Sequence, residues 1–221
     1  MGILDFDGCL GDRMTVNLTY KPYFEVERRK YRFRILNASV ARFFKIALVN
    51  ASGQAQPMTQ IANDGNLLPN PVLLTSLDEQ GIAERYDVVI DFSRFPLGSK
   101  AYFVNLAEHV TGMRPSKDLT VAEALSGLSG DPCVGKFLEF RVVRNPALAD
   151  LSQVPTTLIP NPNLSAIPVA RERVFEFGAS ASQNNADPIS AALGKWGIAT
   201  DGGPQRSADF GRVSAAPKFG T

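Results

Sequence analysis

The chain contains a single histidine, His109, and two cysteines, Cys9 and Cys133, among 221 residues. Imidazole and thiolate commonly hold copper and zinc, and a blue-copper site takes two imidazoles and one thiolate. One imidazole cannot supply such a set, and Cys133 has no histidine beside it. The sequence therefore predicts no metal-binding residue and no cofactor held by this chain. We expect His109 to be a solvent-facing or hydrogen-bonded loop residue.

The two cysteines lie far apart in the sequence and form neither a C-x-x-C motif nor a disulfide framework. Cysteines outside such patterns usually behave as small apolar side chains. We interpret Cys9 and Cys133 as two reduced thiols, with one long-range disulfide as the alternative.

Two further patterns could suggest catalysis or phosphate binding. Asp87 and Asp91 stand four residues apart, on one face of a predicted strand, with no histidine near them. Residues 200–203, Thr-Asp-Gly-Gly, lack the G-x-G-x-x-G spacing and the following helix that a phosphate site requires. We expect a turn there, and no catalytic residue in the chain.

Opposite charges nearly balance, with 23 Lys and Arg against 22 Asp and Glu. This balance provides no long-range field for nucleic acid or an anionic membrane. We expect the basic residues at 28–34 and Arg42 to form ion pairs with Glu84, Asp87 and Asp91, on the outer face or at a domain interface. No segment reaches the roughly 20 apolar residues of a membrane span, and the N-terminus lacks signal-peptide features, so the cellular location stays undetermined.

Short runs of β-branched and aromatic residues, separated by Gly, Pro, Asn and Asp, fill residues 14–143. This pattern is typical of an antiparallel sandwich or barrel. Residues 31–37 alternate, with Tyr31, Phe33 and Ile35 on the apolar face, whereas residues 42–49 are apolar on both faces. Further strands are expected at residues 58–62, 72–75, 86–92, 101–106 and 137–143.

Helical signals are few. Residues 120–123 match a capping box and predict one helical turn, and residues 187–194 combine an N-cap, a first-turn proline and a final glycine. The proline-rich segment after Arg144 lacks alternation, which predicts an extended connector. Beyond it, residues 173–178 and 196–202 predict two strands, and two strands rarely fold alone.

A series of short motifs follows the predicted strands. They are Gly11-Asp12, Val16-Asn17, Pro22, Glu25-Val26 and residues 29–39, 41–43, 61–65, 67–68 and 84–93. In this order and spacing, they resemble the second domain of three-domain multicopper oxidases of the bilirubin oxidase, spore-coat laccase and phenoxazinone synthase type. Residues 200–203 and 212–217 are similar to the start of that family's third domain.

The resemblance implies an all-β fold, a cupredoxin-like Greek-key β-sandwich with an extended C-terminal linker and a strand stub. It places a cupredoxin-like domain at residues 1–145, a proline-rich interdomain linker at 146–172 and an incomplete third domain at 173–221. In the family, His-x-His pairs in the first and third domains and a His-Cys-His segment in the third hold copper. The second domain holds none, and none of these motifs occurs here.

On this resemblance, the chain is a fragment of a multicopper oxidase, a copper-free structural domain that bridges the copper-bearing domains and helps form the substrate cleft. Its partners would be the missing first and third domains. The intact parent would be a copper-dependent oxidoreductase that oxidises phenolic, pyrrolic or metal-ion substrates and reduces oxygen to water; alone, the chain is not expected to be an enzyme.

Two alternatives belong to other functional classes. The first is a non-catalytic β-sandwich binding or assembly module, which would pair with complementary chains through free strand edges. The second is a carbohydrate-binding sandwich, which is weakened because the single tryptophan, Trp196, lies in the tail and not on the predicted sandwich.

Overall fold

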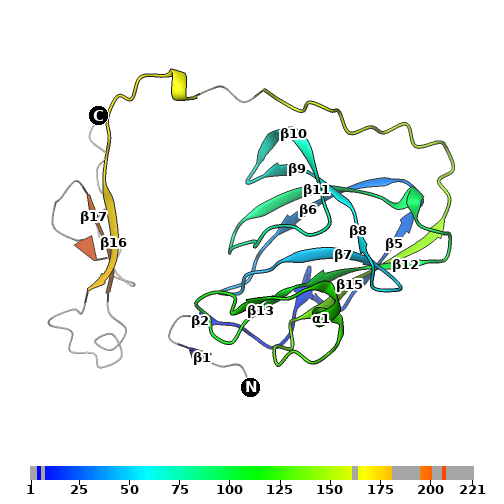
Figure 1. Cartoon of the computed structure of the whole chain (residues 1–221), viewed down its shortest axis with the longest axis horizontal. Coiled ribbons are helices and arrows are strands. Elements are labelled where there is room, and N and C mark those ends of the chain that lie inside the picture. Colours follow the sequence, from blue (N-terminus) through cyan, green and yellow to red (C-terminus); the bar gives the residue numbers. More distant parts are fainter. Residues whose placement is uncertain (1–3, 6–7, 161–163, 181–194, 201–205, 208–221) are drawn as a thin grey trace. The chain divides into compact units, whose positions relative to one another are not determined.

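A computed structural model describes residues 4–5, 8–160, 164–180, 195–200 and 206–207. The chain divides into two compact units, Met1–Pro162 and Asn163–Thr221 (Figure 1). Its regular structure is mostly β-strand, as the sequence predicts. The expected domain limits at residues 145 and 172 stay predictions.

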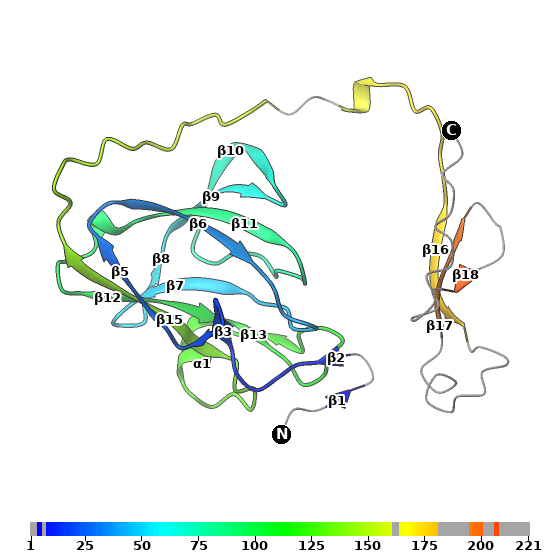
Figure 2. The same ribbon diagram turned by 180° about the vertical axis from the view of Figure 1, so that it is seen from behind.

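Two sheets face each other in the first unit (Figures 1 and 2). In spatial order, one sheet comprises β10 (Asn66–Leu74), β9 (Met58–Asn63), β11 (Arg85–Asp91) and β6 (Lys30–Leu36). The other comprises β5 (Tyr23–Glu27), β15 (Gly135–Arg144), β12 (Lys100–Asn105), β7 (Ile46–Asn50) and β8 (Ala55–Gln56). Neighbouring strands are antiparallel, except that β5 runs parallel to β15. The strands expected from alternation therefore form the sandwich.

Strand β7 shows why an uninterrupted apolar run is buried on both faces. Ile46 and Leu48 belong to the main core between the sheets, whereas Ala47 and Val49 belong to a second cluster on the other side of the strand. The strand begins at Ile46 and not at the expected residue 42. Before it, Lys45 N–H donates to the side-chain Oδ1 of Asn105 at 3.1 Å, and not to the backbone of a neighbouring strand.

Strand β6 follows the predicted alternation. Tyr31, Phe33 and Ile35 pack against the main core, and Arg32 and Arg34 lie on the outer face. Phenylalanine rings from both sheets meet in this core, where the geometry favours edge-to-face contact. The sandwich interior is therefore strongly aromatic.

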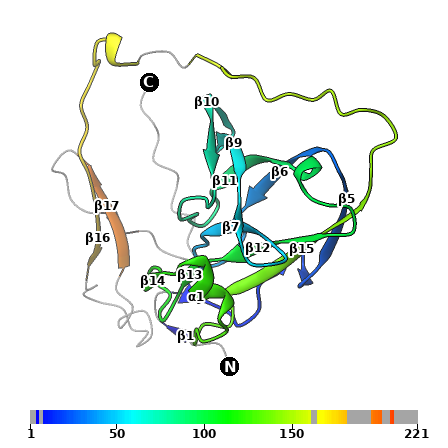
Figure 3. The same cartoon turned by 45° about the vertical axis from the view of Figure 1, so that its right-hand side comes forward.

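The helix α1 (Val121–Leu125) begins at the predicted capping box. Glu123 N–H donates to Thr120 Oγ1 at 3.2 Å, and Thr120 N–H donates to Glu123 Oε2 at 2.8 Å. The helix packs beside β12 and β15 (Figure 3), where Ala124 joins the second apolar cluster. The helix expected at residues 187–194 lies outside the described residues.

Short elements fill the remaining connections of the first unit and open the second. They are β1 (Leu4–Asp5) paired with β2 (Gly8–Cys9), β3 (Thr15–Val16) with β4 (Thr19–Tyr20), β13 (Ala107–Glu108) with β14 (Lys117–Asp118), and the 3-10 helices η1 (Phe92–Arg94) and η2 (Leu164–Ala166).

Residues 145–160, after β15, contain no strand and are held against the sandwich. Lys30 N–H donates to Asp150 Oδ2 at 2.8 Å, and Leu158 N–H donates to Pro69 O at 2.9 Å. This segment is therefore docked on the sandwich through specific hydrogen bonds, and its role as an interdomain connector stays a prediction.

The second unit contains an antiparallel sheet of β16 (Phe175–Ser180), β17 (Lys195–Thr200) and β18 (Arg206–Ser207). Its first two strands correspond to the pair predicted from the sequence. In the part of the chain that the structure describes, no helix is long and apolar enough to cross a membrane.

Candidate functional site

His109 follows β13 and is buried, with 5% of its surface exposed. Its Nε2 accepts a hydrogen bond from the backbone N–H of Phe43 at 3.2 Å. Its Nδ1 lies 3.4 Å from Nη1 of Arg42, and its ring stacks on the Phe43 ring. Of the two expected environments, the hydrogen-bonded one is therefore present and the solvent-facing one is wrong.

Arg42 and Asp131 form a buried ion pair beside this imidazole, with 2.5 Å between Nη1 and Oδ2. The same Oδ2 accepts the backbone N–H of His109 at 2.9 Å, and Oδ1 accepts the N–H of Cys133 at 3.0 Å. We call Arg42, His109 and Asp131 the His109 cluster. It joins three segments that are distant in the sequence, and Arg42 corrects the expectation of ion pairs only on the outer face or at a domain interface.

Burial and neighbouring charges set the protonation states of the groups in this cluster. Burial, followed by the Arg42 guanidinium, lowers the pKa of His109, and Asp131 opposes this effect. Burial also raises the pKa of the Cys133 thiol. The imidazole is thus favoured in its neutral form and the thiol in its protonated form.

Copper ligation requires a free imidazole nitrogen and usually a thiolate. In His109, Nε2 already accepts a backbone hydrogen bond and Nδ1 faces a guanidinium. Within the described residues, no group of three or more His, Cys, Asp or Glu side chains is placed to hold a metal ion. The donor atoms present therefore do not fit a copper centre.

The other residues singled out in the sequence have structural partners. Cys9 is exposed and Cys133 is buried, and both are free thiols, which agrees with the preferred interpretation. Asp87 pairs with Arg32 and Arg34 on the outer face of β6 and β11, as predicted.

Asp91 instead accepts the N–H of Ser93 at 3.0 Å and lies 4.0 Å from Arg94. Glu84 accepts the N–H of Gly81 at 2.5 Å, so a backbone group occupies the carboxylate that we expected in an arginine pair. Residues 201–203 of the expected glycine-rich turn lie outside the described residues.

Gln80 is a buried polar residue that the sequence did not reveal. Its Nε2 donates to Ile35 O at 3.1 Å and to Glu84 O at 2.7 Å, but its Oε1 has no hydrogen-bond partner among the described residues. No local pattern marks Gln80, whereas Arg42 could have been noticed as a charge at the start of an apolar run.

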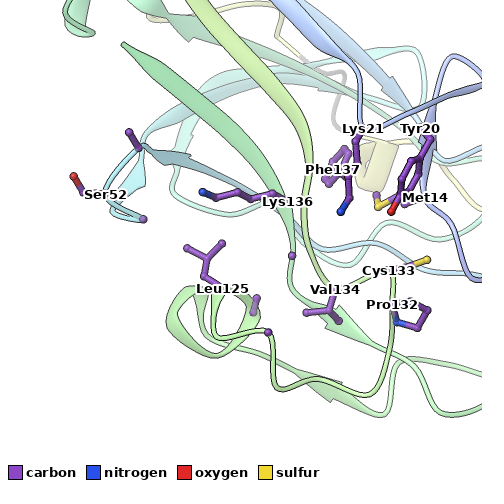
Figure 4. A pocket seen from close by; sticks show the side chains of 15 residues that line it. Met14, Tyr20, Lys21, Ser52, Leu125, Pro132, Cys133, Val134, Lys136 and Phe137 are labelled. Atoms are coloured by element: carbon purple, nitrogen blue, oxygen red, sulfur yellow. The ribbon is translucent and has the colours of Figure 1, made fainter.

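Two hollows lie near these residues. The first, of about 420 Å³, is shown in Figure 4, with Ser52 and Leu125 at one end, Met14 and Tyr20 at the other, and Lys136 between them. The Lys136 ammonium lies over the Tyr102 ring, 4.0 Å from its centroid. The ammonium group in the middle of this hollow is therefore engaged with an aromatic ring.

The second hollow is larger, about 850 Å³, and mostly apolar. It runs beside β6, and we call it the β6 groove. Its walls come from the segment before β5 and from β6, and its floor comes from the aromatic core; residues along it include Val16, Phe33, Ile35, Gln80, Phe103 and Phe140. The lining of the groove is mostly apolar, which suits binding of apolar side chains.

No family model matches the chain. It is similar to a laccase of Bacillus subtilis, with 34% identity over 173 residues, which are 78% of this chain and 29% of that protein. It is also similar to a bilirubin oxidase of Albifimbria verrucaria, with 33% identity over 76% of this chain and 27% of that protein. The multicopper oxidase LPR1 homolog 1 of Oryza sativa subsp. japonica is 38% identical over 67% of this chain and 22% of its own length.

The fold agrees with these similarities. The McoA multicopper oxidase from the hyperthermophile Aquifex aeolicus superposes with a TM-score of 0.58 and 26% identity, over 81% of this chain and 34% of that one. The sandwich is therefore cupredoxin-like, as expected. The chain spans about a quarter of the length of the curated relatives named here. The chain is homologous to a part of these longer multicopper oxidases.

Proposed function

We propose that this chain is the copper-free sandwich domain of a multicopper oxidase, bridging two copper-bearing domains and helping to form the substrate cleft. In this proposal, residues 1–145 are the second domain, residues 146–172 are the interdomain linker and residues 173–221 begin the third domain. The first domain and the rest of the third are its partners. Substrate oxidation coupled to oxygen reduction belongs to the intact protein.

One observation carries the proposal. The sandwich matches copper enzymes, yet the chain's single imidazole is buried with Nε2 occupied by the N–H of Phe43. A domain of a copper enzyme that cannot itself supply the ligands must contribute through structure.

The docked connector supports a bridging role. Asp150 accepts the N–H groups of Lys30 and Ser152, and these bonds hold the pKa of its carboxyl well below its usual range. Arg29 lies 3.9 Å from the same carboxylate. A connector tied down in this way leaves the sandwich along a defined path, as a bridge between domains requires.

A chimera tests this role. The stretch of the Bacillus subtilis laccase that matches this chain is replaced by the corresponding residues of the chain. We expect the chimera to bind the same number of copper ions as the parent laccase and to oxidise a phenol. The purified 221-residue chain, measured in parallel, should retain only substoichiometric copper after dialysis.

The matched control is the same chimera carrying His109→Gln. If His109 is structural, this change leaves the copper content of the folded chimera unaltered. Stoichiometric copper in the isolated chain, or a folded chimera that binds no copper, contradicts the proposal.

A further inference from the structure

Among the described residues, strand β6 pairs with β11 alone and is an edge of the four-stranded sheet (Figure 2). Two hydrogen bonds fix which peptide groups face that neighbour. Phe92 N–H donates to Arg29 O, and Asn37 N–H donates to Glu84 O. Because peptide groups alternate in direction along an antiparallel strand, the odd-numbered residues of β6 face β11. The even-numbered ones face away.

The outward peptide groups belong to Lys30, Arg32, Arg34 and Leu36. The Lys30 N–H confirms that even-numbered residues face away from β11, because it donates to Asp150 Oδ2 of the connector. The other three have no strand beside them among the described residues. An exposed row of this kind is a template for pairing with another strand.

The core-facing side of the same strand is also incompletely covered. Tyr31, Phe33 and Ile35 are only partly buried, whereas Val88 and Ile90, at corresponding positions of β11, are completely buried. The β6 groove lies beside these half-covered side chains. An element that covered these side chains would therefore need apolar residues and would lie next to the unpaired edge of β6.

Charge and polarity describe the partner further. On the outer face, the Arg34 side chain is 77% exposed and its Nε lies 3.8 Å from Asp87, so its guanidinium is available to an acidic neighbour. Gln80 also lines the groove, but its unpartnered Oε1 is buried away from solvent, so we assign it no contact with the occupant.

We propose that β6 and its groove bind, as an added strand, an extended segment from the part of the longer protein that this chain does not cover. The segment places apolar side chains in the groove and acidic or polar side chains beside Arg32 and Arg34, and its backbone bonds to the outward peptide groups of β6. The multicopper oxidases that this chain matches have most of their length outside the match, and we take the strand to come from that remainder. The proposal rests on the proposed function for the source of the strand. Its failure is distinguishable, because absence of peptide binding would not alter the copper content of the chimera.

The experiment uses the 221-residue chain and overlapping peptides of about 12 residues, long enough to pair along a whole strand. The peptides cover the part of the Bacillus subtilis laccase that lies outside its match to this chain. Binding is measured by fluorescence polarisation, and amide hydrogen exchange is followed by NMR. We expect one region of the peptide set to bind and to slow exchange at Arg32, Arg34 and Leu36. Tyr31, Phe33 and Ile35 should be protected with and without peptide.

Two variants at one position separate backbone pairing from charge. Arg34→Pro removes an outward N–H, which an edge strand tolerates, and should weaken peptide binding about tenfold or more. Arg34→Ala keeps the N–H and should weaken the binding of an acidic peptide by only a few-fold. Arg94→Ala, on η1 and outside the groove, should leave the affinity unchanged.

Three results would overturn the proposal. One is that no peptide binds, and another is that a bound peptide leaves exchange at Arg32, Arg34 and Leu36 unchanged. The third is a stable dimer in size-exclusion chromatography whose interface protects these amides, which would make a second copy of the chain the occupant. The exchange measurement on the unaltered chain decides the question even if Arg34→Pro fails to fold.

Discussion

Strands β7 and β6 carry similar apolar residues, but their surroundings differ. Leu48 and Val49 of β7 are completely buried, because the main core covers one face and the cluster beside α1 covers the other. Phe33 and Ile35 of β6 stay half-buried, because no strand within the described part of the chain lies beyond that edge. Burial is thus set by how many neighbouring elements a strand has as well as by its own residues.

The polar groups of the two regions differ in the same way. We count the His109 cluster with β7 as the closed side because its polar groups are paired, although Arg42 also lines the β6 groove. Here Asp131 accepts bonds from Arg42, His109 and Cys133. On the open side, Gln80 Oε1 lacks a donor among the described residues. We therefore expect changes on the closed side to affect folding stability and changes at the β6 edge to affect recognition.

The strongest way to break the closed side is Asp131→Ala. It leaves the Arg42 guanidinium buried without its carboxylate, which should lower the free energy of unfolding by about 3–5 kcal/mol. Urea denaturation followed by circular dichroism measures this loss. Asp87→Ala, which removes an outer-face carboxylate, is the matched control and should cost about 0–1 kcal/mol. Equal losses in the two variants would show that the buried Arg42–Asp131 pair contributes no more to stability than an ion pair on the outer face.

Truncation of one core residue on each strand compares the regions directly. Leu48→Ala should lower the free energy of unfolding by about 3 kcal/mol, because it leaves a cavity in a fully packed core. Ile35→Ala should cost about 1–2 kcal/mol, because that side chain is already half-exposed at the groove. The same urea titrations give both values, and a loss at Ile35 as large as that at Leu48 would show that the groove side is closed.

The sequence predicted those features that depend on local patterns. Alternation in residues 31–37 placed Tyr31 and Phe33 toward the core, and the run at residues 42–49 indicated burial on both faces. The capping box at Thr120 predicted where α1 begins. Each signal spans only a few residues, so no tertiary contact was needed to recognise it.

The His109 cluster and the β6 groove could not be predicted in this way. Arg42 bonds to Asp131 across 89 positions of sequence, and the run that contains Arg42 otherwise indicated a strand. The groove exists because β6 has a strand on one side alone in the part of the chain that the structure describes. Alternation along a strand is the same whether or not its edge is paired. Both features follow from long-range arrangement.

Acid should weaken the closed side through His109. Its pKa is lowered in the folded chain from an ordinary value of 6.5, so below about pH 6.5 the unfolded chain binds a proton that the folded chain resists. Stability is therefore complete above this pH and falls as the pH drops toward the lowered folded value. We expect the free energy of unfolding to fall between pH 7.5 and 5.5 in urea titrations. His109→Gln should remove this dependence, and an identical slope in that variant would assign it to other groups.

The smallest effect on stability is expected at the unpaired edge of β6. It distinguishes this edge from the fully buried strand β7. The Arg34 guanidinium is 77% exposed, with its Nε 3.8 Å from a carboxylate that Arg32 also contacts, so Arg34→Ala should change the free energy of unfolding by less than about 0.5 kcal/mol. The same variant should still reduce binding of an acidic strand to β6. A side chain that contributes to recognition and almost nothing to folding is expected at an edge that pairs with another polypeptide. If Arg34→Ala instead destabilised the chain as much as Leu48→Ala, β6 would belong to the closed part of the structure.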